Sequence, residues 1–591
     1  MVTLQSLMPR PMSPLRATTA LAVACITALS AARGNDVRLP DIGSSAGTIM
    51  TQQDQREYGA AVLHELRSYG MVLDDALLND YINSLGYKLV SNSDRPDLPF
   101  NFFLMRDEQI NAFAVPGGYI FTYTGLLTAM AREDDVAAVL AHEISHVTQQ
   151  HLLRAFEDMQ KMSLPIMLGM LGVLIASQHR TDDAGTAAIM TGTSLMQQRQ
   201  INFTRHDEAE ADRVGIQALA RSGFDPLAMA DAFSTLQRVM RVNGIDVPEF
   251  LLDHPVDTRR IADAKSRAEH LDCPTALPRT HADTQRTSGT LNLNLPDTPP
   301  AAVASEAEAE ASAVAASDAA TTTIEKGSPK DGTLPRVSVN ACGVRNSGGE
   351  SYFELMRERA RVLSSNSVPA LRGYYADNLR NNPAFDTPAN RYGYALALTI
   401  THEAQAALVE LRKLVAQKPG SSVFRLALAD ALDQAGSVQE SLRVYDQLNS
   451  DFPGNRAVTQ SYADSLLARG DDKSSHRAQE LLRPLVERYG DDPDLQKSYG
   501  RACQLAGDKV RAAEAYAEAA YLNGNAEDAL NQLKALAKQP DLTFYQRSRV
   551  DARITRLTPE VLALRKRGTR EDPTSEAPGS LMPSFGCCQK R

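Results

Sequence analysis

Two histidines and a glutamate stand at a spacing that suits a metal site. Segment 142–146 reads HEISH. Residues four apart on a helix share one face, so His142 and His146 can bind the same zinc ion. Glu143 lies beside that face, where its carboxylate can take a proton from a metal-activated water. The pattern therefore predicts one zinc site per chain, with Glu143 as the general base of a hydrolytic reaction.

A second acidic segment offers the remaining protein ligand, because a catalytic zinc needs a third ligand and an open fourth position. Segment 206–213 reads HDEAEADR. Glu208 and Asp212 share a helix face, whereas Glu210 lies two residues from each and points elsewhere. We assign Glu208 to the metal and expect Asp212 to hydrogen-bond a ligating histidine and fix its tautomer. His206 is the rival ligand, and a solvated acidic face is the alternative interpretation of the segment.

A further histidine, His254, precedes a proline in the segment DHP. A proline biases the residue before it toward extended backbone, so this imidazole sits on a rigid segment. It is either a loop histidine or a group near the zinc, acting as a fourth ligand or as a donor to the oxyanion. The sequence leaves these interpretations open.

The elements around these motifs predict a mostly helical domain with a small sheet. Apolar residues recur at helical spacing over 57–69 and 75–90. Residues 100–105 and 118–124 read as strands. We expect an α+β fold over residues 38–272, in which helices dominate.

The strand expected at 118–124 offers a way to hold a peptide. An extended chain can pair with a free strand edge, which reads backbone more than side chains and would suit a protease of misfolded chains. Strand edges are also common without any ligand, so a purely structural strand is the alternative. The residues proposed for substrate binding here are Asn111, Gly117, Gly118 and Tyr119.

An apolar segment lies between the two ligand-bearing segments. Residues 164–176 read LPIMLGMLGVLIA, which is too short to span a bilayer. Methionine-rich apolar segments adapt to varied surfaces. The segment is therefore either a buried core helix or a lid or membrane-surface loop, the latter giving peripheral membrane contact.

The region 350–566 predicts a helical repeat domain. Similar phrases end at Gly436, Gly470 and Gly507, which are 34 and 37 residues apart. This is the period of tetratricopeptide repeats, helix-turn-helix units that stack into a solenoid. A plain helical bundle is the alternative interpretation. Together with the preceding domain, the chain is expected to be mostly α.

The remaining segments read as a leader, a linker and a tail. Residues 1–32 resemble a secretory signal peptide, with arginines before a short apolar run and small residues at the cut. Lipid anchoring at Cys25 is a minor alternative, and a disordered start is another. Residues 273–349 lack large apolar side chains and predict a flexible low-complexity linker, with a helical spacer as the alternative. Residues 567–591 predict a frayed tail.

Composition limits the function classes. The chain has 591 residues, a net charge of −10 and an apolar content of 43%. The acidic balance argues against nucleic-acid binding, which usually needs a basic face. The ordinary apolar and charged contents exclude a wholly disordered or membrane-embedded chain. Six cysteines are too few for a disulfide scaffold.

These motifs resemble those of a known family. HEISH, followed about sixty residues later by E-x-x-A-D at 208–212 and preceded by NAFAVPGGYI at 111–120, is similar to the gluzincin-type zinc metallopeptidases of the HtpX and Oma type. LPDIG at 39–43 and the His254-Pro255 pair resemble a periplasmic subgroup with a C-terminal tetratricopeptide domain. The resemblance covers residues 38 to about 272 by motif, and residues 350–566 by architecture alone.

The resemblance implies a site and a role. It assigns the metal to His142, His146 and Glu208, the general base to Glu143, and a second acidic function, sometimes described as a proton donor, to Asp212. It implies an exported zinc endopeptidase of the periplasm that acts on misfolded or misassembled envelope proteins. The repeats would then contact the outer-membrane assembly machinery. A chaperone or adaptor that acts mainly by binding through the repeats is the alternative function.

Overall fold

The computed structural model describes residues 50–157, 205–243, 254–271 and 352–566. Several sequence predictions concern residues outside the described parts of the chain: the signal peptide at 1–32, the apolar segment at 164–176, the linker at 273–349 and the tail at 567–591.

Two helices open the first domain, as the sequence predicts. Helix α2 spans Gln52–Ser68, and α3 spans Ala76–Val90. Thr51 caps α2 through a reciprocal pair of hydrogen bonds with Asp54. Asp75 caps α3 by accepting a hydrogen bond from a backbone N–H of its first turn.

A three-stranded sheet follows these helices. Strand β1 spans Asn101–Met105, β2 spans Ala112–Val115 and β3 spans Tyr119–Tyr123. The strand order is β1-β3-β2, with β1 parallel to β3 and β2 antiparallel to it. The strands expected at 100–105 and 118–124 are confirmed. The expectation that the second of them offers a free edge is wrong, because β3 is paired on both sides along its length.

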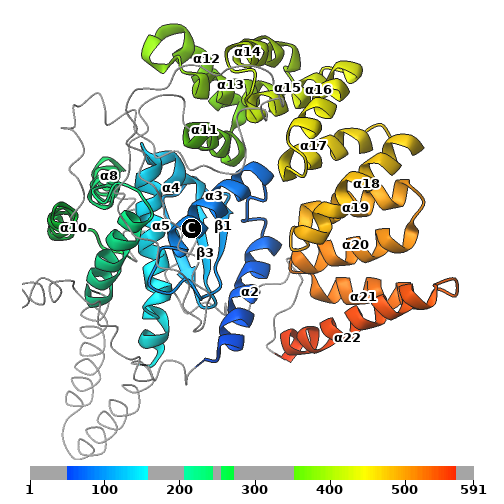
Figure 1. The fold of residues 1–591 in the computed structure, drawn as a ribbon, viewed down its shortest axis with the longest axis horizontal. Helices are drawn as coiled ribbons and strands as arrows, with labels where there is room; N and C mark the ends of the chain where they lie inside the picture. Colours follow the sequence, from blue (N-terminus) through cyan, green and yellow to red (C-terminus); the bar gives the residue numbers. More distant parts are fainter. Residues whose placement is uncertain (1–49, 158–204, 244–253, 272–351, 567–591) are drawn as a thin grey trace, which may run out of the picture. The chain divides into compact units, whose positions relative to one another are not determined.

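The helix that carries HEISH lies in the core of this domain. After α4 (Thr124–Ala129), α5 runs over Glu133–Thr148 and packs against α3, β2 and α8 (Ala228–Asn243). Figure 1 shows α5 beside the sheet. Nearly every residue of α5 is buried, including both faces of its middle turns. The position of its side chains is therefore fixed by packing from several directions.

Two further segments complete the first domain. Residues 205–221 form a helix that carries the second acidic motif. Helix α10 spans Thr258–His270, begins at the cap Asp257 and packs against α8. This arrangement of helices around a small sheet confirms the predicted α+β domain.

The second part of the chain is helical throughout its described residues. From α12 onward, each α-helix packs against the next one in sequence, and alternate helices such as α15 and α17 also touch. Its elements are α11 (Tyr352–Ser364), α12 (Val368–Asn381), η3 (Pro383–Phe385), α13 (Pro388–Ile400), α14 (Ala404–Gln417), α15 (Ser422–Gln434), α16 (Val438–Asp451), α17 (Arg456–Leu467), α18 (Asp472–Arg488), α19 (Pro493–Leu505), α20 (Lys509–Leu522), α21 (Ala526–Ala537) and α22 (Phe544–Lys566).

The repeat glycines end helices in this region. Gly436, Gly470 and Gly507 follow α15, α17 and α19, and all three have positive φ angles. Glycine adopts this left-handed conformation at helix ends without a Cβ penalty. The mostly α fold class is confirmed, whereas the assignment to tetratricopeptide repeats stays a prediction. No helix of the described residues has the length and apolar character needed to cross a membrane.

Candidate metal centre

Helix α5 presents both histidines of the HEISH motif on one face. His142 is fully buried, and Glu143 is 1% exposed. The Nε2 atoms of His142 and His146 lie 3.0 Å apart. The two imidazoles therefore converge as predicted, from positions one turn apart on a buried helix.

Glu208 approaches these histidines from the helix over 205–221. Its Oε2 atom lies 3.4 Å from Nε2 of His142, and its Oε1 atom lies 3.5 Å from Nε2 of His146. Ligand atoms bound tetrahedrally to zinc at about 2.0–2.1 Å are roughly 3.3 Å from one another. The spacings match this value, and two imidazoles with a carboxylate are an ordinary donor set for zinc.

His254 joins the same cluster. Its Nδ1 atom lies 2.8 Å from Oε1 of Glu208 and 3.4 Å from Nε2 of His142. The ligand atoms of His142, His146, Glu208 and His254 all lie within 4.8 Å of one another. Nε2 of His254 also lies 3.6 Å from a carboxylate oxygen of Glu143. The structure thus places His254 beside the ligands and the base, not on a distant loop.

Asp212 contacts the edge of the His142 ring that points away from the cluster. Its Oδ1 atom lies 3.0 Å from Nδ1 of His142. This is the contact expected from the helical spacing of Asp212 and Glu208. An imidazole that gives its Nδ1–H to a carboxylate keeps Nε2 unprotonated and free to bind a metal.

Arg260, on α10, connects the two carboxylates of the site. Its guanidinium lies 2.7 Å from Asp212 and 2.8 Å from Glu208. The guanidinium also lies over the ring of Phe233, 4.7 Å from the centroid. Sequence reasoning missed this residue, because no spacing rule links an arginine on α10 to acids some fifty residues earlier. Its position six residues after His254 was the available signal.

Burial and the neighbouring polar and charged groups shift the pKa values of these side chains in opposite directions. Burial disfavours the charged form of His142, but hydrogen bonds to Asp212 and Glu208 outweigh it and raise the pKa of His142 to about 10. Burial would also neutralise Glu208, yet the charge of His254 and the hydrogen bond of His142 hold the pKa of Glu208 well below its usual range. Glu208 is therefore ionised, as metal binding requires, whereas His142 of the metal-free protein is protonated and must release its Nε2 proton when a metal binds.

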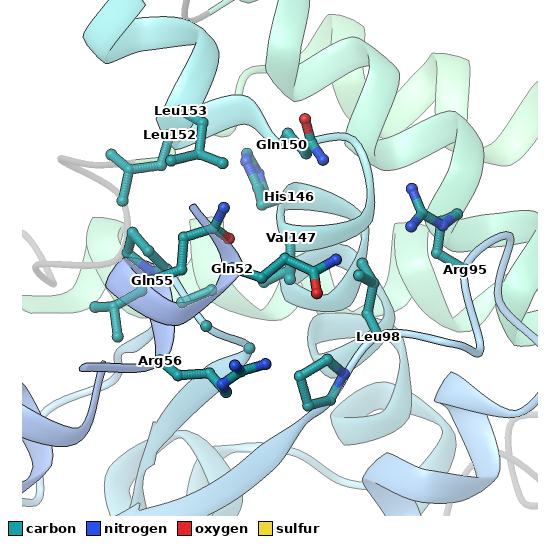
Figure 2. Close-up of a pocket in the computed structure, with 16 residues that line it drawn as sticks. Gln52, Gln55, Arg56, Arg95, Leu98, His146, Val147, Gln150, Leu152 and Leu153 are labelled. Carbon is teal, nitrogen blue, oxygen red and sulfur yellow. The ribbon is translucent and has the colours of Figure 1, made fainter. Parts of the chain in front are cut away.

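A pocket opens beside His146. Figure 2 shows residues of α2, of the end of α5 and of the segment that follows α5 around it. Its walls include Gln52 and Gln55 of α2, Ala114 and Val115 of β2, and Leu153. Through His146, the cluster therefore borders a cavity that is also lined by the outer strand of the sheet.

The residues predicted to bind a substrate strand lie at the turn between β2 and β3 and at the ends of these strands, and their role in binding stays a prediction. Asn111 is 3% exposed, and its backbone oxygen accepts a hydrogen bond from Tyr123. Gly117 and Gly118 form the turn between β2 and β3 with φ angles of +90° and +78°, and both line the pocket. The ring of Tyr119 stacks on Phe103 and covers Gly59. Of this set, only the two glycines border the pocket.

Two further histidines, His206 and His151, differ in their burial and in their distance from the cluster. His206, the rival ligand, is exposed and is not part of the cluster. His151, whose spacing assigns it no role in the sequence, is 4% exposed, and its Nδ1 atom lies 2.9 Å from Nδ1 of His146. Glu210 contacts Nε2 of His151 at 3.2 Å and does not reach the cluster.

Comparison with known proteins shows a family match over the part of the chain that carries this site. Residues 76–268 match the model of peptidase family M48. The chain is 41% identical over 233 residues to the beta-barrel assembly-enhancing protease of Escherichia coli strain K12, covering 39% of this chain and 47% of that one. The Yersinia pestis protein of the same name is 40% identical over 233 residues, covering 39% and 48%.

A more distant relative is mitochondrial. The metalloendopeptidase OMA1 of Saccharomyces cerevisiae is 29% identical over 154 residues, which cover 26% of this chain and 41% of that one. The chain spans about half the length of the curated relatives it matches first. The predicted resemblance to zinc metallopeptidases is confirmed for residues 76–268. The zinc prediction is confirmed with it, because the family is zinc-dependent and the cluster can hold a metal ion.

Proposed function

Because residues 76–268 match peptidase family M48, we propose that this protein is an exported zinc endopeptidase. The observation that carries the proposal is the position of Glu143. Its buried carboxylate lies next in sequence to the ligand His142 and 3.6 Å from His254. A carboxylate at the edge of a three-ligand metal cluster is placed to serve as a general base.

The proposed reaction divides roles among these side chains. When bound, zinc lowers the pKa of water and polarises the scissile carbonyl. Glu143 accepts a proton from the attacking water and delivers it to the nitrogen of the departing amine. Asp212 and Arg260 hold His142 and Glu208 in place through the contacts described above. Asp212 lies behind His142, so we assign it an orienting role and not that of a proton donor.

The substrate is proposed to lie along the outer edge of β2. One side of β2 pairs with β3, and its other side pairs with no strand among the described residues. Ala114 and Val115 of this strand line the pocket that also contains His146. An extended peptide paired with β2 would therefore pass the metal cluster, and backbone pairing would accept many sequences.

The cellular role is proposed from the relatives. The Escherichia coli relative is named for enhancing beta-barrel assembly. We propose that this protein acts in the periplasm on misfolded or misassembled envelope proteins, and that its helical repeats bind the outer-membrane assembly machinery. Peripheral contact with the membrane belongs to the same proposal.

The experiment is a digestion assay with a metal control. The purified protein is incubated with casein and with an unfolded outer-membrane β-barrel protein, before and after removal of zinc by a chelator. We expect cleavage of both substrates, loss of cleavage with the chelator and recovery on adding zinc. Binding of the β-barrel protein without cleavage under any metal condition would instead support the chaperone or adaptor alternative.

A further inference from the structure

His146 has a buried hydrogen-bonding partner on the side away from the metal cluster. Nδ1 of His146 lies 2.9 Å from Nδ1 of His151, and the two rings meet nearly at right angles. The pair cannot form along a regular helix, since residues five apart point in different directions. A break in the backbone must therefore bring the second ring back.

That break is at Gln150. Helix α5 ends at Thr148, and Gln150 has a φ angle of +57°, in the left-handed region that non-glycine residues rarely adopt. Such a conformation is strained in a residue other than glycine and persists only where its surroundings hold it. The turn directs His151 toward His146, and Figure 2 shows Gln150 next to His146 at the pocket.

His151 is itself held in place by the helix over 205–221. Its Nε2 atom lies 3.2 Å from Oε2 of Glu210. The same oxygen accepts a hydrogen bond of 2.8 Å from Arg154. The carboxylate of Glu210 is thus fixed by a cation on one side and binds the imidazole on the other.

We infer that His151 and Glu210 are positioning residues for the metal ligand His146. A metal-binding Nε2 of His146 must be unprotonated, so its proton lies on Nδ1 and is donated to Nδ1 of His151. His151 then carries its own proton on Nε2 and donates it to Glu210. This chain fixes the tautomer and ring orientation of His146, as Asp212 does for His142.

A second metal ion is not the role of this group. His151, Asp207 and Glu210 have ligand atoms close enough to share a metal. However, Arg154 lies 2.8 Å from Glu210 and 3.9 Å from Asp207, so a cation already faces both carboxylates. Nδ1 of His151 faces His146. The hydrogen bonds explain the cluster without an additional ion.

Two variants of His151 separate positioning from packing. His151→Leu fills a similar volume but removes the acceptor, whereas His151→Asn is smaller and keeps an acceptor oxygen near the place of Nδ1. If His151 positions His146, the leucine variant weakens zinc binding by about 10–100-fold and the asparagine variant recovers most of the loss. If the residue only fills space, the asparagine variant is the weaker binder, because it leaves a cavity.

The readouts are the zinc dissociation constant by chelator competition and the visible spectrum of the cobalt(II)-substituted protein. His206→Leu is the matched control, because His206 is exposed on the helix that carries Glu210; it should bind zinc like the wild type. Unchanged zinc affinity in His151→Leu, or a weaker asparagine variant, would overturn the inference.

A third variant covers the case in which His151→Leu does not fold. Glu210→Ala changes a partly exposed residue and should weaken zinc binding by about 10-fold, with an altered cobalt spectrum. In the double variant His151→Asn/Glu210→Ala, removal of the Glu210 carboxylate should weaken zinc binding less than it does in the otherwise wild-type protein, because Glu210 acts through the His151 imidazole. Unchanged zinc affinity in Glu210→Ala would contradict the chain. The inference rests on the proposed zinc site but not on proteolysis, so a protein that binds zinc without cleaving would contradict only the proposed function.

Discussion

Nδ1 of His142 lies 3.0 Å from Asp212, while Nε2 of the same ring lies 3.4 Å from Glu208. Two acids four residues apart on one helix thus contact opposite sides of a single imidazole. One of them completes the metal cluster, and the other keeps the proton on the far nitrogen. The helix over 205–221 therefore contributes both a metal ligand and the partner that orients His142.

The first prediction concerns Glu208. Removing a direct ligand should weaken zinc binding by more than the roughly 10–100-fold that loss of an outer partner causes. We therefore expect Glu208→Ala to lose zinc during dialysis against a weak chelator. His206→Ala, two residues away and exposed, should retain it. Metal analysis of the two proteins decides, and zinc loss from the His206 variant alone would mean that the ligands are misassigned.

The spacing of residues predicted this part of the site because a regular helix fixes which side chains share a face. His142, His146, Glu208 and Asp212 all lie on regular helices, and their spacing sufficed. His151 could not be placed in this way, because Gln150 leaves the helical region and redirects the chain. Arg260 arrives through the packing of α10, which local sequence does not specify.

The sheet shows a second kind of feature that the residue pattern could not predict. The strands at 101–105 and 119–123 were identifiable from their residues, but their order was not. The parallel pairing of β1 with β3 is a long-range contact that local residue patterns do not specify, and β2, which forms a local hairpin with β3, was not identified as a strand from its residues. The prediction that β3 offers an edge failed for this reason, and β2 takes that position.

The second prediction concerns His254. Its Nδ1 atom lies among the ligand atoms, so the side chain is placed to close the fourth position of the metal. His254→Ala should then raise the rate of casein cleavage by roughly 10-fold, since activity follows the fraction of molecules with an open site. A fall of about 10²-fold would instead identify His254 as a donor to the oxyanion. Steady-state kinetics with equal zinc content separate these results.

The third prediction concerns removal of the metal. A ligand present at about 100 times its dissociation constant stabilises the folded state by about 2.7 kcal/mol. Chelation should therefore lower the thermal unfolding temperature of the wild type by about 5–10 °C, and zinc should restore it. The Glu208→Ala variant should show a much smaller shift. Equal shifts in the two proteins would place the stabilising metal elsewhere.

The fourth prediction concerns the backbone conformation of the β2–β3 turn. Gly118 has a φ angle of +78°, and a Cβ there would lie 1.9 Å from the backbone oxygen of Pro99. Gly223 has the same φ angle with nothing within 4 Å. Gly118→Ala should lower the free energy of unfolding well beyond the roughly 1 kcal/mol expected for Gly223→Ala. Denaturant melts measure both, and equal losses would show that the turn tolerates a side chain.

The central claim is that Glu143 is the base of a zinc endopeptidase. The most direct test measures zinc content and casein cleavage in the same preparations of wild type and Glu143→Gln. The substitution leaves the ligands untouched and removes the proton acceptor, so we predict full zinc occupancy and a cleavage rate lower by about 10²–10⁴-fold. A Glu143→Gln protein that holds zinc and cleaves at the wild-type rate would contradict the claim, and one that loses zinc would make Glu143 a structural residue.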